Sequence, residues 1–167
     1  IPLLTAQGVI NFFPGGDAGL YVSGKVLLAL QALPLGCAKV GGRLLAVHAD
    51  DPRLTYQFAR RFLEHNRQAI QTAQAAGEKK LAEYPRRPGT LVVEVLMTVE
   101  AQRAEREHPV SVTAYHLTNS GQGVALDIYH LPLEVTAFVF QAMSATYREA
   151  WDALQCRGWE VSSAKRA

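Results

Sequence analysis

A short acidic stretch with one histidine is the best candidate for catalytic chemistry. An apolar run over 43–49 is typical of an interior strand; it contains His48 near its end and is followed by Asp50 and Asp51. Open α/β sheets bind ligands and metals at the carboxyl ends of strands, so these residues could centre a small metal-dependent hydrolase or phosphatase. Asp51-Pro52, however, is already explained as a helix start. Because no second acidic cluster completes a site, we predict no metal, no cofactor and no enzymatic activity.

The other residues with reactive side chains add little to an enzymatic interpretation. None of the five histidines forms the HxxxH pair that binds zinc on a helix. His116 and His130 are expected on two paired strands, but not directly opposite each other. Cys37 has no basic neighbours, which favours a small buried side chain over a reactive thiolate. Nucleophile-elbow and phosphate-loop motifs are also absent from the sequence.

Basic residues are concentrated in one segment. The whole chain has a net charge of +2, but residues 51–89 hold eight basic and four acidic residues, a net of +4. Such a segment could contact the phosphates of a nucleic acid without reading its sequence. It could equally be a solvated helix face with ordinary ion pairs, or a surface that docks onto an acidic protein. The predicted phosphate contacts are Arg60, Arg61, Lys79, Lys80, Arg86 and Arg87.

Amide side chains lie between two β-rich runs near residue 120. Asn119, Ser120 and Gln122 lie in a predicted loop over 118–123 that also contains Gly121 and Gly123. Asn and Gln can donate to and accept from base edges, so we predict that these three residues form a base-contact loop. The alternative is a plain turn that uses Asn and Gly for their backbone freedom.

The elements that position these residues predict an α/β (α+β) fold. Alternating residues over 110–117 and 126–130 indicate a hairpin within 111–130, part of a small, largely antiparallel sheet. We expect about four helices to pack on it, near 17–33, 51–76, 90–106 and 133–156, with a charged loop over 78–89.

Caps and apolar spacing give the predicted helices their ends and their buried sides. Asp17 and Asp51 are expected N-caps, Thr90 could cap the third helix, and Gly77 should end the second. The buried side of the first helix should be Leu20, Val26, Leu27, Leu30 and Leu33. That of the second should be Leu54, Phe58, Phe62 and Ile70, with most arginines facing away. The apolar spacing of the last helix continues without a break to Gly158.

Two segments, 112–123 (VTAYHLTNSGQG) and 126–132 (LDIYHLP), are followed by an early helical phenylalanine at Phe138. These stretches resemble the large subunits of type I CRISPR interference complexes (Cascade), in particular the type I-B and Myxococcus-type variants. Residues 14–19, 35–37 and 41–45 are similar as well. This chain has three residues between Tyr115 and Asn119, where the family pattern has two.

The resemblance implies a non-catalytic large subunit of a crRNA-guided complex. It would bind target double-stranded DNA, recognise the protospacer-adjacent motif (PAM) and support recruitment of a helicase–nuclease. Its other partners would be the crRNA and the backbone, guide-end and small subunits of Cascade. Large subunits of this kind are several hundred residues long, so we expect the amino-terminal part of a longer chain. No residue is carried over as an established ligand.

Length and composition agree with one folded unit. The 167 residues are 49% apolar and 8% aromatic, which supplies a hydrophobic core and excludes wholesale disorder. We therefore predict a single α/β domain over 1–167. Two distant cysteines indicate no disulfide framework, and neither a signal peptide nor a membrane span is recognisable. The predicted location is the cytoplasm.

Overall fold

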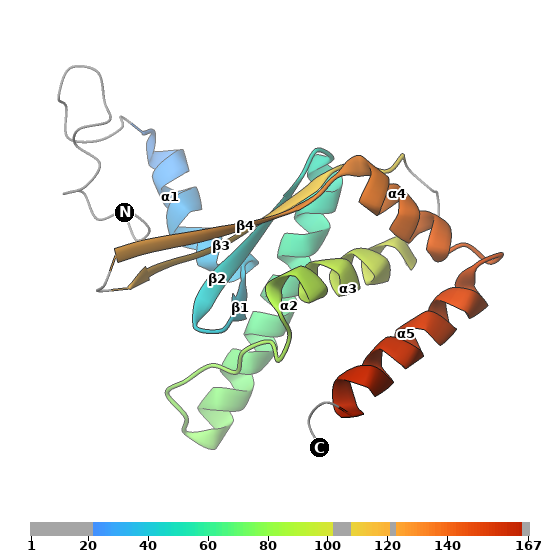
Figure 1. The fold of residues 1–167 in the computed structure, drawn as a ribbon. Helices are drawn as coiled ribbons and strands as arrows, with labels where there is room; N and C mark the ends of the chain where they lie inside the picture. The colour runs from blue at the N-terminus through green and yellow to red at the C-terminus, as the bar shows by residue number, and fades with distance from the viewer. Residues whose placement is uncertain (1–21, 102–107, 121–122, 165–167) are drawn as a thin grey trace.

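The computed structural model describes residues 22–101, 108–120 and 123–164. Within them, the chain forms a mixed α+β fold with a four-stranded antiparallel sheet, as predicted (Figure 1). The strands, in the spatial order of their numbers, are β1 (Ala38–Val40), β2 (Arg43–Ala49), β3 (Val112–Ser120) and β4 (Gly123–Leu131). The helices are α1 (Gly24–Ala32), the short 3₁₀ helix η3 (Leu33–Gly36), α2 (Pro52–Ala76), α3 (Pro88–Ala101), α4 (Leu133–Ala142) and α5 (Arg148–Ala164).

Strand β2 is the predicted interior strand, since it pairs with β1 on one side and β3 on the other. Strand β1 was not predicted, because three residues are too few to show a period. Gly41 and Gly42 connect β1 to β2 with φ angles of +54° and +76°. Glycine adopts this left-handed region without strain, so the pair makes the tight turn that a hairpin requires.

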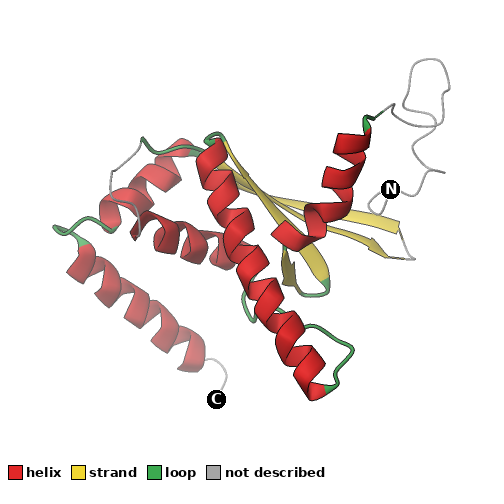
Figure 2. Cartoon of the chain, turned by 180° about the vertical axis from the view of Figure 1, so that it is seen from behind, coloured by secondary structure: helices red, strands yellow, loops and turns green. Residues whose placement is uncertain are grey.

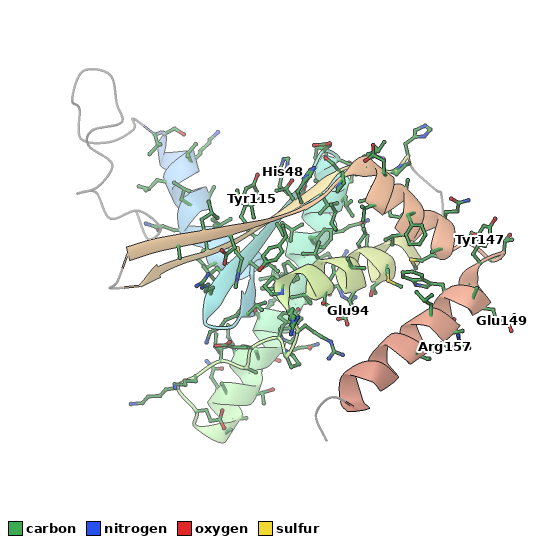
Figure 3. All side chains as sticks on the ribbon, in the orientation of Figure 1. His48, Glu94, Tyr115, Tyr147, Glu149 and Arg157 are labelled. Atoms are coloured by element: carbon green, nitrogen blue, oxygen red, sulfur yellow. The ribbon has the colours of Figure 1, made fainter. Side chains whose placement is uncertain are left out.

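The core lies between one face of the sheet and the helices α2 and α3. Leu45 of β2, Phe58 and Phe62 of α2 and Leu96 of α3 are completely buried there. Figure 2 shows α2 crossing this face of the sheet. The other face is open: Ile128 lies in one register row with Ala46 and Tyr115 and remains mostly exposed. In Figure 3, Tyr115 and His48 lie on this open side.

Helix α2 follows the sequence prediction closely. The Asp51 carboxylate accepts a hydrogen bond from the Arg53 amide at 2.8 Å, Pro52 is the first helical residue, and Gly77 ends the helix with φ +68°. Leu54, Phe58 and Phe62 are buried as predicted, whereas Ile70 is only half-buried. Ala69 and Ala73 occupy the buried side of the last turns instead.

The prediction of a buried side for the first helix is wrong. Asp17 and Leu20 lie outside the described residues, and α1 is capped by Ser23. No residue of α1 is buried: Val26 and Leu27 are exposed, and Leu30 and the C-cap Leu33 are only half-buried. The reason is position, since α1 packs mainly on η3 and does not lie across the sheet.

Two other helix predictions need correction. Helix α3 begins at Pro88, ahead of Thr90, and residues 102–107 lie outside the description. The helix expected over 133–156 is two helices, α4 and α5, separated by turns at 143–147. Ser144 and Thr146 in that break are weaker helix formers than their neighbours. Phe138 still contacts Trp151 across the break, with ring centroids 5.8 Å apart, so the apolar spacing did not reveal it.

None of the helices in the described part of the chain has the length and apolarity needed to span a membrane.

Candidate nucleic-acid interface

The outer side of α2 carries a row of arginines. Arg53, Arg60 and Arg67 are seven residues apart, so they share the helix face opposite Phe58 and Phe62. All three side chains are exposed. Fourteen residues of helix span about 21 Å, so this arginine ridge (Arg53, Arg60 and Arg67) presents cations at intervals of about 10.5 Å. Such a row suits a polymer with regularly spaced negative charges.

The ion pair seen at Arg60 is exposed and weak. Arg60 Nε contacts Glu64 Oε1 at 3.0 Å, and both side chains are more than half exposed. An exposed pair of this kind contributes at most about 1 kcal/mol, so a phosphate could replace the carboxylate at small cost. The sequence prediction included Arg60 but left out Arg53 and Arg67. Their seven-residue spacing was the signal that could have identified them.

Arg61 lies a quarter-turn away from the ridge, beside the loop that follows α2. Its charge acts on Tyr84, opposing the burial that raises the pKa of that phenol to about 12. Tyr84 packs edge-on against Phe62 and stacks on His65, with ring centroids 3.9 Å apart in the stacked pair. The Tyr84 amide also donates to the Lys39 carbonyl at 2.9 Å. These contacts fix the middle of the loop over 78–87.

Glu83 ties the same loop to the β1–β2 turn. Its carboxylate accepts a hydrogen bond from the Gly42 amide at 2.9 Å and contacts Lys39 Nζ at 3.2 Å. The Gly42 amide, and then Lys39, lower the pKa of Glu83 below its usual value. Lys79 and Lys80 lie in the exposed part of the loop before this anchor.

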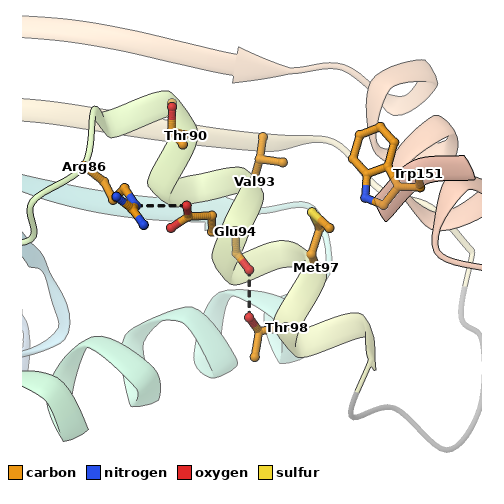
Figure 4. A pocket seen from close by; sticks show the side chains of 8 residues that line it. Arg86, Thr90, Val93, Glu94, Met97, Thr98 and Trp151 are labelled. Atoms are coloured by element: carbon orange, nitrogen blue, oxygen red, sulfur yellow. Dashed lines mark hydrogen bonds and ion pairs between the residues drawn. The ribbon is translucent and has the colours of Figure 1, made fainter. Parts of the chain in front are cut away.

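The structure does not gather all six predicted phosphate contacts on one face. Arg86 Nε contacts Glu94 Oε1 at 3.0 Å, so its guanidinium lies along α3 (Figure 4). Together they line a cavity of about 720 Å³ that Trp151 of α5 also borders. Arg87 is exposed at the residue before α3. Only Arg60 belongs to the ridge, while Arg61 and the loop cations lie beside it.

The predicted base-contact loop is placed differently from the expectation. Asn119 and Ser120 belong to β3, where they pair with Val124 and Gly123 of β4. The flexible loop expected over 118–123 is therefore wrong for residues 118–120 and 123, because strand pairing continues as far as Ser120 and Gly123. Gln122 lies outside the described residues. In Figures 1 and 2 this end of the hairpin and the 78–87 loop lie at separate corners of the molecule.

The alternative metal site gains no support from the geometry. Asp51 caps α2, and the Asp50 carboxylate accepts a hydrogen bond from the Ser111 hydroxyl. His48 is exposed on the open face of the sheet. Among the described residues, no group of three or more His, Cys, Asp or Glu side chains could hold a metal ion.

Two minor predictions about individual side chains are confirmed. Asp127 lies opposite His116, and Thr113 lies opposite His130, so the two histidines do not pair across the hairpin. His116 is buried against the Val40 carbonyl, 2.9 Å from its Nε2. Burial raises the pKa of the Cys37 thiol to about 11, and its Sγ donates to the Leu33 carbonyl. Cys37 is therefore a packing residue.

Comparison with known proteins gives no match: no protein-family model, no curated protein and no solved structure corresponds to this chain.

Proposed function

We propose that this chain is a non-catalytic DNA-binding part of the large subunit of a crRNA-guided type I CRISPR complex. In this proposal it acts in the cytoplasm, binds target duplex DNA, contributes to PAM recognition and supports recruitment of a helicase–nuclease. The observation that carries the DNA-binding part is the arginine ridge on α2. The resemblance of residues 112–123 and 126–132 carries the CRISPR part.

The position of the ridge supports binding to a phosphate backbone. The opposite side of α2 is held in the core by Phe58 and Phe62, so the ridge is presented on a rigid element. Arginine pairs with phosphate through a planar fork of donors and stays charged at any physiological pH. Phosphate contacts position a duplex without reading it, which suits a protein whose sequence recognition is delegated to a guide.

The first prediction concerns the salt dependence of DNA binding. The variant Arg53→Ala/Arg60→Ala/Arg67→Ala should bind a 24-base-pair duplex more weakly than the wild-type chain. Each lost phosphate contact lowers the slope of log K against log salt by ~0.9, so three contacts lower it by ~2.7. Fluorescence anisotropy of a labelled duplex across a salt series measures this slope.

A matched control separates the ridge from net charge. Lys25→Ala/Arg148→Ala/Arg157→Ala removes the same three charges from α1 and α5. This control should keep most of the wild-type slope. Equal losses in the two variants would mean that only total charge matters, and an unchanged slope in the ridge variant would exclude α2 as the DNA-binding surface.

The second prediction concerns the guide. The tagged chain, recovered from the cells that make it, should carry RNA that contains spacer and repeat sequence, as a member of a crRNA-guided complex must. Sequencing of the bound RNA measures this. The ridge variant should retain the same RNA because its lost contacts are to DNA. Recovery of no repeat-derived RNA, with the chain intact, would contradict the CRISPR assignment and leave the DNA-binding proposal standing.

A further inference from the structure

Helices α4 and α5 diverge from the turns at 143–147 (Figures 1 and 2). An apolar groove lies between them. The groove has a volume of about 340 Å³. Its apolar walls are formed by Phe138 and Ala142 of α4, by Tyr147 in the turn, and by Trp151 and Leu154 of α5.

Three of the apolar side chains that line this groove are at least half exposed to solvent. Phe138 is 58% exposed, Tyr147 50% and Leu154 65%. Single exposed apolar residues are ordinary, but several that converge on one groove mark a site for another apolar surface. A groove between two helices is the shape that receives the apolar face of a third helix.

The charges around the groove identify the chemistry of its occupant. Trp151 and Leu154 share one face of α5, and Tyr147, directly before the helix, lies on the same side at about 100° of rotation per residue. By the same rotation, Arg148 and Arg157 lie on the two edges of that face, near its opposite ends. Both arginines are exposed and have no ion-pair partner within the described part of the chain.

The carboxylates of α5 lie on its other side. Glu149 and Asp152 fall about 150° away from the centre of the apolar face. Figure 3 shows Glu149 directed outward, away from α4. Of the described charged side chains on α5, those beside the groove are therefore both arginines; on α4, Glu134 lies one turn before Phe138 on the same helix face. A second copy would bring two arginine-edged faces together, so like charges disfavour self-pairing through α5.

We propose that the α4–α5 groove binds an amphipathic helix of a partner protein that carries acidic residues beside its apolar face. Apolar side chains of the partner pack against the exposed sides of Phe138, Tyr147 and Leu154. Its carboxylates pair with Arg148 and Arg157, which fixes the orientation of the bound helix. This surface is separate from the arginine ridge of α2, so the two proposals can fail independently.

The test uses two synthetic peptides and the full chain. Both are 18-residue helices with leucines at positions i, i+4, i+7 and i+11; one has glutamates beside the leucine face and the other has lysines. Isothermal titration calorimetry should show the acidic peptide binding at least about tenfold more tightly, since two attractive charge pairs replace two repulsive ones. Arg148→Glu/Arg157→Glu should reverse this preference.

Matched variants separate the groove from nonspecific apolar binding. Leu154→Glu should abolish binding, whereas Leu28→Glu, at an equally exposed leucine of α1 (68%), should leave it unchanged. Circular dichroism confirms that both variants are folded. Equal affinity for the two peptides, or binding that survives Leu154→Glu, would overturn the proposal. So would concentration-dependent dimerisation in sedimentation that Leu154→Glu abolishes, because the occupant would then be a second copy.

Discussion

The two ends of the described chain contrast with its middle. Helix α2 has one apolar side, and that side is sealed against the sheet, with Phe58 and Phe62 fully buried. Helix α1 is more apolar than α2 as a whole, yet none of its residues is buried. Helix α5 likewise exposes Leu154. Apolar spacing thus indicates that a helix forms, but it does not indicate that the rest of the chain supplies a partner.

The physical difference lies in what each helix can reach. The β2–α2 connection is short, and the Asp51 cap starts α2 directly at the end of β2, so the helix turns back over the sheet. Helix α5 starts beyond the 143–147 turns and contacts α4 through Phe138 and Trp151. The middle of the chain therefore buries its apolar side within the described fold, whereas α1 and α5 keep apolar side chains exposed.

The third prediction compares two phenylalanines and has the largest expected effect on stability. Phe58→Ala removes a fully buried ring and should lower the free energy of unfolding by about 3–5 kcal/mol, because both transfer energy and cavity formation contribute. Phe138→Ala removes a ring that is already mostly exposed, so it should cost under about 1 kcal/mol. Urea unfolding followed by circular dichroism measures both values.

Either of two results would break the comparison between middle and ends. A loss for Phe138→Ala as large as that for Phe58→Ala would mean that α4 and α5 fold against the core as tightly as α2 does. A small loss for Phe58→Ala would mean that the core tolerates the cavity. The first result would also contradict the interpretation of the α4–α5 groove as an exposed surface.

Local signals allowed much of the fold to be predicted. Asp51-Pro52 and Gly77 mark both ends of α2 because capping depends only on neighbouring residues. Alternation identified the β3–β4 hairpin, although its strands extend further than predicted, to Ser120 and from Gly123. The number of ladder pairs at a hairpin end depends on register, which polar residues such as Asn119 do not reveal.

The candidate interface was only partly predictable. The seven-residue repeat of Arg53, Arg60 and Arg67 is visible in the sequence, since it needs only helical geometry. The partner of Arg86 is not visible, because Glu94 comes close only once the 78–87 loop has folded back onto α3. Composition grouped all basic residues of 51–89 together, and tertiary structure divides them between the ridge and the loop.

The last and smallest predicted effect is the pH dependence of stability that His65 causes. Burial lowers the pKa of His65, which stacks on Tyr84, below its ordinary value of 6.5. The unfolded chain therefore binds a proton more readily than the folded chain, so stability should fall as pH drops through 6.5. Glu83 does not interfere in this pH range. Its pKa is lowered in the folded chain, so the stability that it contributes is lost only as the pH falls below about 4.5. Urea midpoints at pH 7.5 and 5.5 measure the fall.

His65→Phe keeps an aromatic ring against Tyr84 and should reduce this fall in stability, whereas His48→Phe, at an exposed position, should not. An equal pH dependence in all three proteins would show that His65 protonates as easily in the folded chain as in the unfolded one, and that the packing of Tyr84 against α2 is looser than the stacked geometry indicates.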